Sequence, residues 1–225
     1  MTVVGLDGCR GGWVAVALSE DGRVDAHHLP TVDHVDLAVP DAQVVGIDIP
    51  IGFATSGCRE ADTLARARLG RRASSVFLTP LRDVLAAATY AEANALSVEL
   101  SGRGISRQAY ALAAKVFEVE QWLTTTGRTV VEVHPELTFT EMLGAPATHS
   151  KKTWAGMIER RDALAREGIR LGGDLGLAGA LAAVDDVLDA AAVAWTARRV
   201  RDGTAVCHPD PAMLGQNGRA VAIWS

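Results

Sequence analysis

The alternation of apolar and polar residues divides the N-terminal part of the chain into short strands. Val3–Leu6 predicts a first strand and Trp13–Leu18 a second, joined by the glycine-rich segment GCRGG. Because glycine permits the positive φ angles of tight reversals, we expect these two strands to form a hairpin. A third short strand is predicted at Arg23–Leu29, and a turn or short helix at Thr31–Val39.

Two further strands are predicted on either side of a long helical region. The apolar run VVGIDIPIG (Val44–Gly52) is rich in β-branched residues, which is typical of a strand covered on both faces. From Cys58 to about Gly127 the composition shifts to Ala, Leu, Arg and Glu, and Arg107–Leu123 has apolar residues at helical spacing. Strand character returns at Thr129–Leu137, where a proline prevents continuation of a central ladder.

The last third of the chain predicts helices and one short strand. We expect a helix at Lys151–Glu167, a glycine-rich loop at Arg170–Gly179, an alanine-rich helix at Leu181–Arg201 and a strand near Ala205–His208. No repeat, low-complexity segment or flexible linker interrupts the 225 residues. The pattern therefore predicts one domain, with helical insertions at about residues 54–127 and 138–178.

Net charge and cysteine spacing limit the classes of binding partner and the cellular compartment that we expect. The net charge of −5 gives no general attraction for nucleic acid, so such a partner would need a local basic patch or bound metal ions. The three cysteines lie far apart without a CxxC pair, which favours a reducing compartment over a disulfide framework or a zinc ribbon. With no signal-like N-terminus and no uninterrupted apolar span, we expect a cytoplasmic protein without a membrane partner.

Carboxylates recur at positions that suit metal chemistry. Asp7 and Asp48 each lie near the C-terminal end of an apolar strand, so neighbouring strands would bring both within reach of one divalent ion. The alternative for each is the capping of a turn. In DDVLDAAAVAWTARR, Asp186 and Asp189 are three residues apart and share a helix face. Capping and dipole compensation by Asp185 and Asp186 is the alternative there.

The segment VEVHPE adds Glu132, His134 and Glu136 to these candidates. Strand alternation places Glu132 and His134 on the same side. His134 suits a metal ligand, a proton shuttle or a substrate contact, and the alternative is a hydrogen-bonded structural histidine.

Basic and hydroxyl side chains cluster in GRRASSVF and SKKT, and such clusters can hold phosphate oxygens. The backbone of GCRGG can also donate to a phosphate. The solvent-exposed first turn of a helix often has the same mixture of basic and hydroxyl residues. Each cluster alone is therefore weak evidence for a phosphate site. The candidate substrate-binding residues are Arg10, Arg71, Arg72, Ser74, Ser75, Lys151 and Lys152.

Several well-known site motifs are missing from the sequence. It has no GxxxxGK[ST] loop, no GxSxG elbow and no HExxH, and GCRGGW lacks the spacing of GxGxxG. These absences argue against P-loop nucleotide triphosphatases, α/β-hydrolases, zincins and Rossmann dinucleotide-binding proteins.

The segments GLDGCRGGW, GIDIPIG, GRRASSVF, SRQAYALAAKVFEVE, EVHPELTF, SKKT and DDVLDA follow one another along nearly the whole chain. In this order they resemble the bacterial and archaeal "domain of unknown function 429" proteins, described as predicted nucleases of ribonuclease H-like fold. The resemblance implies an α/β fold with a mixed five-stranded sheet, three antiparallel strands followed by two parallel ones, flanked by helices. It also implies that Asp7 and Asp48 match the acids of the first and fourth strands. Asp186 and Asp189 resemble the final-helix acids of Holliday-junction resolvases.

Together, the acids and the resemblance predict a Mg²⁺- or Mn²⁺-dependent phosphodiester hydrolase, a nuclease, with Asp7, Asp48 and Asp189 as metal ligands. The candidate catalytic residues are Asp7, Asp48, Asp186, Asp189, Glu132, His134 and Glu136. One alternative is an enzyme or sensor that binds a nucleotide or small phosphorylated molecule on a related actin/ribonuclease H-like core. Another is a non-catalytic interaction module. The partner is accordingly nucleic acid or a phosphorylated small molecule.

The helical insertion is foreign to a minimal nuclease, so it either builds a specialised pocket or covers the groove. The group Arg71, Arg72, Ser74 and Ser75 is expected on the same side of the sheet as Asp7 and Asp48, where it forms the wall of the site that binds the substrate phosphate.

Overall fold

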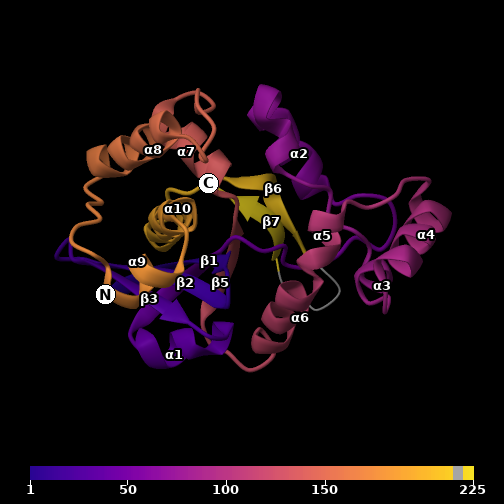
Figure 1. The fold of residues 1–225 in the computed structure, drawn as a ribbon, viewed down its shortest axis with the longest axis horizontal. Helices are drawn as coiled ribbons and strands as arrows, with labels where there is room; N and C mark the ends of the chain where they lie inside the picture. The colour runs from indigo at the N-terminus through magenta and orange to yellow at the C-terminus, as the bar shows by residue number, and fades with distance from the viewer. Residues whose placement is uncertain (215–219) are drawn as a thin grey trace.

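The computed structural model describes residues 1–214 and 220–225 and shows a mixed sheet of seven strands with helices on both faces (Figure 1). The strand order is β3-β2-β1-β4-β5-β7-β6. The first three strands are antiparallel, β4, β5 and β7 continue parallel to β1, and β6 returns antiparallel to β7. The strands are β1 (Thr2–Cys9), β2 (Gly12–Ser19), β3 (Val24–Leu29), β4 (Ala42–Ile47), β5 (Thr129–Val133), β6 (Cys207–Leu214) and β7 (Ala220–Trp224).

The sheet is larger than the predicted five strands. The expected strand at Ala205–His208 covers only the start of β6, and β7 was not predicted. The sequence of β6, CHPDPAML, contains two prolines that indicate a turn. Because β6 lies at the edge of the sheet, it tolerates prolines that a central ladder would exclude.

Helices differ from their predicted bounds mainly at their ends. The strand predicted at Thr129–Leu137 stops at Val133, because Pro135 begins a helix. The helix predicted at Arg107–Leu123 is two helices, and the predicted loop at Arg170–Gly179 already contains the start of α9. The helices are α1 (Val35–Ala38), α2 (Glu60–Leu69), α3 (Arg82–Leu85), α4 (Tyr90–Ser101), α5 (Arg107–Ala111), α6 (Ala113–Trp122), α7 (Pro135–Leu143), α8 (Trp154–Arg166), α9 (Gly176–Leu181) and α10 (Val184–Arg201), with 3₁₀ turns at Val32–His34 and Gly70–Ser75.

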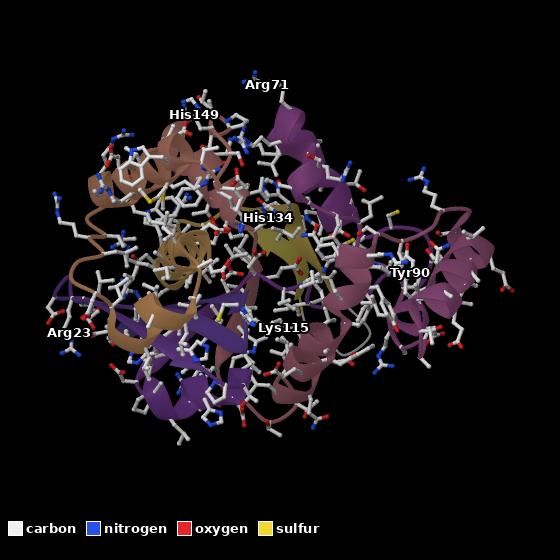
Figure 2. All side chains as sticks on the ribbon, in the orientation of Figure 1. Arg23, Arg71, Tyr90, Lys115, His134 and His149 are labelled. Carbon is white, nitrogen blue, oxygen red and sulfur yellow. The ribbon has the colours of Figure 1, made fainter. Side chains whose placement is uncertain are left out.

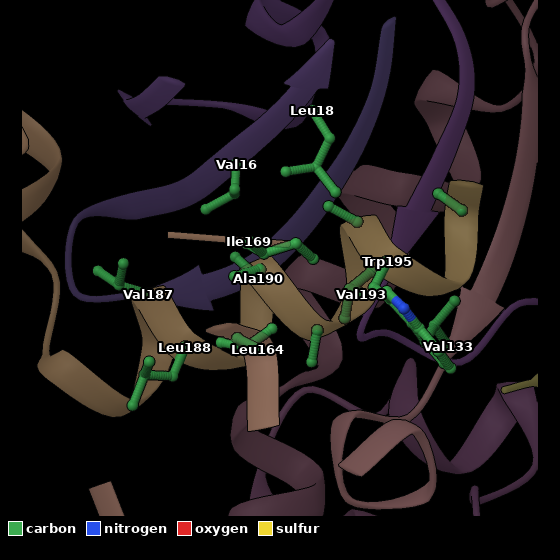
Figure 3. Close-up of a cluster of buried hydrophobic side chains, with 14 of the residues drawn as sticks. Val16, Leu18, Val133, Leu164, Ile169, Val187, Leu188, Ala190, Val193 and Trp195 are labelled. Atoms are coloured by element: carbon green, nitrogen blue, oxygen red, sulfur yellow. The ribbon is translucent and has the colours of Figure 1, made fainter. Parts of the chain in front are cut away.

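Strand alternation divides the core into two layers. On one face, Val3 and Val44 pack with the apolar side chains of α10, as Figure 3 shows for part of this cluster. On the other face, Leu6 and Ile47 pack with Val116 and other side chains of α6, and with α1. Both faces of β1 and β4 are therefore covered, as the near-continuous apolar sequence of β4 predicts. Within the described residues, no helix is both long and apolar enough to cross a membrane.

Helix α10 lies unusually close to the sheet because β1 and β4 each present a glycine to it. A Cβ on Gly5 would lie 2.1 Å from the carbonyl oxygen of Ala190 and 2.1 Å from the amide nitrogen of Ala194. A Cβ on Gly46 would lie 2.8 Å from Cγ1 of Val193. The alanine-rich face of α10 matches these glycines, and the contact fixes the helix directly beside the ends of the two strands.

Candidate functional site

Asp7 and Asp48 lie side by side at the carboxyl ends of two paired strands. β1 and β4 are parallel, with Gly5 opposite Gly46, and the Asp48 amide donates to the carbonyl oxygen of Leu6 (3.0 Å). Each aspartate follows its glycine by two residues, in GLD and GID, so strand alternation turns both toward the α10 face. The repeated spacing therefore brings the two carboxyl groups together.

Helix α10 adds Asp189 to this pair. Asp189 directly precedes Ala190, which rests on Gly5, and its side chain is only 1% exposed. Lys151 donates from Nζ to its Oδ2, while Oδ1 is buried without a hydrogen-bond partner. The glycine contact thus sets the depth at which Asp189 enters the site.

The other acids at the start of α10 contact lysines or the backbone. Asp185 lies 2.7 Å from Nζ of Lys152 and 3.7 Å from Nζ of Lys151. Asp186 accepts a hydrogen bond from the amide of Ala183 (3.3 Å), which is the capping role considered for it, and it also lines the cavity described below.

The three converging carboxyl groups have strongly perturbed acidities. Burial raises the pKa of Asp7 well above its usual range, and the charges of Asp48 and Asp189 raise it further. Burial also raises the pKa of Asp48 to about 7 and that of Asp189 to about 7, although the Lys151 ammonium opposes both shifts. Burial disfavours the charge of Lys151, yet Asp189, Asp7 and Asp48 hold its pKa above the ordinary value. All three aspartates are therefore ionised together near neutral pH only when additional positive charge lies close to them.

His134 lies at the end of β5 and has a defined tautomer. Its Nε2 is 3.2 Å from the carbonyl oxygen of Ser75, which can only accept, so Nε2 carries the proton. Nδ1 is buried without a partner, and burial lowers the pKa of the ring. His134 is accordingly a neutral imidazole with a free acceptor nitrogen.

Glu132 belongs to a buried ion-pair network. Arg59 donates to both of its oxygens, at 2.6 and 2.7 Å, and the Ile51 amide donates to it at 2.7 Å. Arg59 also donates to Asp62 (2.5 Å). Burial raises the pKa of Glu132, and the charge of Arg59 opposes that shift. This network connects the segment after β4 to β5, and it occupies both carboxylate oxygens of Glu132, which was a candidate catalytic residue.

Glu136, in the first turn of α7, is only partly satisfied. The wholly buried Arg160 donates to its Oε1 (2.5 Å). Its Oε2 is buried without a hydrogen bond and lies 3.9 Å from Nε of Arg72. Arg72 itself donates to the carbonyl oxygens of Ala147 (2.7 Å) and His149 (2.5 Å).

A cavity of about 440 Å³ joins most of the candidate residues. Those that line it are Asp7, Asp48, Asp186, Asp189, Glu132, His134, Glu136, Arg72, Ser74, Ser75, Lys151 and Lys152. We call it the acid cavity. Residues from both predicted insertions therefore line the same cavity as the aspartates at the ends of β1 and β4.

Arg10 and Arg71 are not among the residues that line the acid cavity. Arg10 is exposed in the β1–β2 turn. Arg71 is exposed in the 3₁₀ turn that follows α2, away from the central His134 (Figure 2), and lines an adjoining hollow that shares Arg72, Ser74 and Ser75 with the acid cavity. Consecutive side chains in a 3₁₀ turn diverge by about 120°, so Arg72 faces inward while Arg71 does not. The expectation that both arginines form one wall is therefore corrected to Arg72 alone.

Two of the lining residues and a supporting arginine were missed from the sequence. Arg59 and Asp62 line the cavity, and Arg160 supports Glu136 from behind. All three lie in helix-rich segments where charged residues usually face solvent, so no sequence signal distinguishes them.

Comparison with known proteins adds one result. A family model described as "Protein of unknown function (DUF429)" matches residues 5–214. The chain belongs to this family. No curated protein and no solved structure matched it. The part of the chain matched by the DUF429 model contains both strand-end aspartates and the acids of α10.

In the described part of the chain, no group of three or more His, Cys, Asp or Glu side chains is arranged to hold a metal ion. The cation at the carboxyl cluster is the Lys151 ammonium, which bonds Asp189 and lies 3.7 Å from Asp185. Any metal site formed by these acids therefore requires Lys151 to move.

Proposed function

We propose that the protein is a divalent-metal-dependent phosphodiester hydrolase on a ribonuclease H-like core, with Asp7, Asp48 and Asp189 as ligands of Mg²⁺ or Mn²⁺. One observation carries this proposal: three carboxyl groups from β1, the end of β4 and α10 converge at one cavity, and each has a raised pKa. Burying three carboxyl groups together is costly, and the single charge of Lys151 compensates only part of them, so such a cluster is poorly explained as structural.

The donor set suits a hard cation. Carboxylate oxygens are the preferred protein ligands of Mg²⁺, and Oδ1 of Asp189 is buried without a partner. A divalent ion would replace the single charge of Lys151 and would supply Lewis acidity and a water of lowered pKa when bound.

The remaining cavity residues have roles that follow from their contacts. Arg72 and Lys152 are the cationic side chains placed to bind and orient a phosphate, and Lys151 joins them once it leaves Asp189. His134 offers its unpaired Nδ1 as a proton acceptor from the attacking water. The serine hydroxyls of the Gly70–Ser75 turn can donate to the other phosphate oxygens.

A second candidate is the binding of a phosphorylated small molecule without hydrolysis, by an enzyme of another reaction type or a sensor. The size of the acid cavity favours it, because about 440 Å³ lies within the roughly 300–1,000 Å³ of small-molecule sites. The net charge of −5 also gives no general attraction for a duplex.

Cleavage assays test the proposed hydrolase. Purified protein with Mn²⁺ is offered single-stranded, duplex, hybrid and branched nucleic acids, and small chromogenic phosphodiesters. We expect cleavage of at least one of them, with a loss of roughly 100-fold or more in Asp7→Asn and Asp48→Asn. Asp83→Asn, an exposed aspartate of α3, is the matched control. Activity that survives Asp7→Asn, or binding of a phosphorylated molecule without cleavage of any diester, would reject hydrolysis by this cluster.

A further inference from the structure

A second cavity, of about 640 Å³, adjoins the acid cavity within the helical insertion. It lies among the segments around α3, α4 and α5, which form one side of the molecule in Figure 1. The two cavities share the lining residues Ser74, Ser75, Val76, Phe77, Thr79 and Gln108. The two cavities therefore adjoin, and a ligand that occupied both would contact these shared residues.

Thr79, at the junction of the two cavities, has an unsatisfied hydroxyl. The residue is 3% exposed, and its Oγ1 is buried without a hydrogen-bond partner. Its amide donates to Asp62 (2.7 Å), which belongs to the Arg59 network, so the backbone here is held in place. A buried hydroxyl without a partner is unfavourable, and a ligand atom at the junction would satisfy it.

The second cavity combines an apolar lining with polar edges. Phe77, Leu81, Val84 and Ile105 contribute apolar side chains, and Arg103 and serines of α4 border them. Small-molecule sites typically show this mixture, and the volume lies within their usual range of roughly 300–1,000 Å³.

We propose that the second cavity binds the organic group of a small phosphate ester, of about the size of an aromatic ring or a nucleoside, whose phosphate lies in the acid cavity. Thr79 donates or accepts a hydrogen bond at the junction of the two parts. The position of the phosphate rests on the proposed function, whereas the preference for a ring rests on the second cavity alone.

Binding of two matched ligands tests this assignment. Phenyl phosphate and methyl phosphate have the same phosphate group and differ in the ring, and neither needs to be cleaved. By titration calorimetry with Mg²⁺, we expect phenyl phosphate to bind roughly tenfold or more tightly than methyl phosphate, because it buries a ring.

Matched tryptophan variants of α4 test whether the ring lies in the second cavity. Leu100 lines it and is 48% exposed, so Leu100→Trp fills the cavity without disturbing the core. Val98, 49% exposed on the same helix, does not line it and gives the control Val98→Trp. We expect the preference for phenyl phosphate to disappear in Leu100→Trp and to remain in Val98→Trp. Thr79→Val, nearly the same shape, is expected to weaken phenyl phosphate binding several-fold.

Equal binding of the two ligands, or an unchanged preference in Leu100→Trp, would overturn the assignment. Tighter binding of a duplex oligonucleotide than of phenyl phosphate, insensitive to Leu100→Trp, would also overturn it. If no diester is cleaved but the ring preference and its loss in Leu100→Trp are observed, the proposed hydrolase fails and the second cavity stands.

Discussion

Nζ of Lys151 donates a hydrogen bond to Oδ2 of Asp189, and this ammonium is the cation at the carboxyl cluster. The lysine comes from the segment before α8 and the aspartate from α10, so two separate parts of the chain meet there. Lys151 compensates part of the charge of Asp7, Asp48 and Asp189, and the proposed metal ion would compete with it for these carboxylates.

Removal of the lysine is predicted to strengthen metal binding. In Lys151→Met the carboxylates lose their internal cation, so the affinity for Mn²⁺ should rise by roughly tenfold or more. The metal-free variant should also be less stable, by about 1–3 kcal/mol at pH 8, since Asp189 becomes an unpaired buried charge. Titration calorimetry and urea unfolding measure the two effects. Arg170→Met removes an exposed cation that does not line the acid cavity and is the control. Equal Mn²⁺ affinity in the wild type and Lys151→Met would refute the competition.

The pH dependence of stability reports the raised pKa of Asp48. Because this carboxyl has a pKa of about 7 in the folded protein and about 3.9 when unfolded, the native state binds the extra proton between these values. Stability of the metal-free protein should therefore fall as the pH rises from 4 to 7.

Asp48→Asn removes that contribution. It should match the wild type at pH 4 and exceed it by about 1–3 kcal/mol at pH 8, as measured by urea unfolding without metal. Asp83→Asn, at an exposed position, should show no such change. A difference between Asp48→Asn and the wild type that does not grow with pH would contradict the shifted pKa.

The contact between Gly5 and α10 is predicted to control both the fold and the site. In Gly5→Ala the new methyl group would lie 2.1 Å from backbone atoms of α10, so the helix must move away from β1. We expect a loss of about 1–3 kcal/mol or more in the free energy of unfolding, together with weaker Mn²⁺ binding as Asp189 withdraws. Gly127→Ala, where a Cβ meets open space, is the control. Wild-type stability and metal affinity in Gly5→Ala would disprove this packing.

The part of the site built on the sheet could be predicted from the sequence, because local pattern determines it. Apolar strands that end in aspartate, and the helical spacing of Asp186 and Asp189, predicted acids that the structure does place at one cavity. The glycines of GLD and GID allow α10 to pack close to β1 and β4. This packing role was not recognised from the sequence.

Ion pairs between residues far apart in the chain could not be predicted from the sequence. Arg59 joins Glu132, 73 positions away, and nothing in either local segment indicates a buried partner. The same applies to Lys151, whose sequence suggested a phosphate contact and whose ammonium instead bonds Asp189. Strand β6 was predicted only at its start, and β7, which pairs with β5 and β6 from a distant part of the chain, was not predicted.

A crystal of the wild-type protein soaked in Mn²⁺ would show whether the three aspartates bind a metal ion. Anomalous difference density locates Mn²⁺ independently of any activity. We expect a peak bounded by the carboxylates of Asp7, Asp48 and Asp189, with Nζ of Lys151 withdrawn from Asp189. This expectation would be contradicted by a crystal at saturating Mn²⁺ in which Lys151 still bonds Asp189 and no ion lies between the three aspartates.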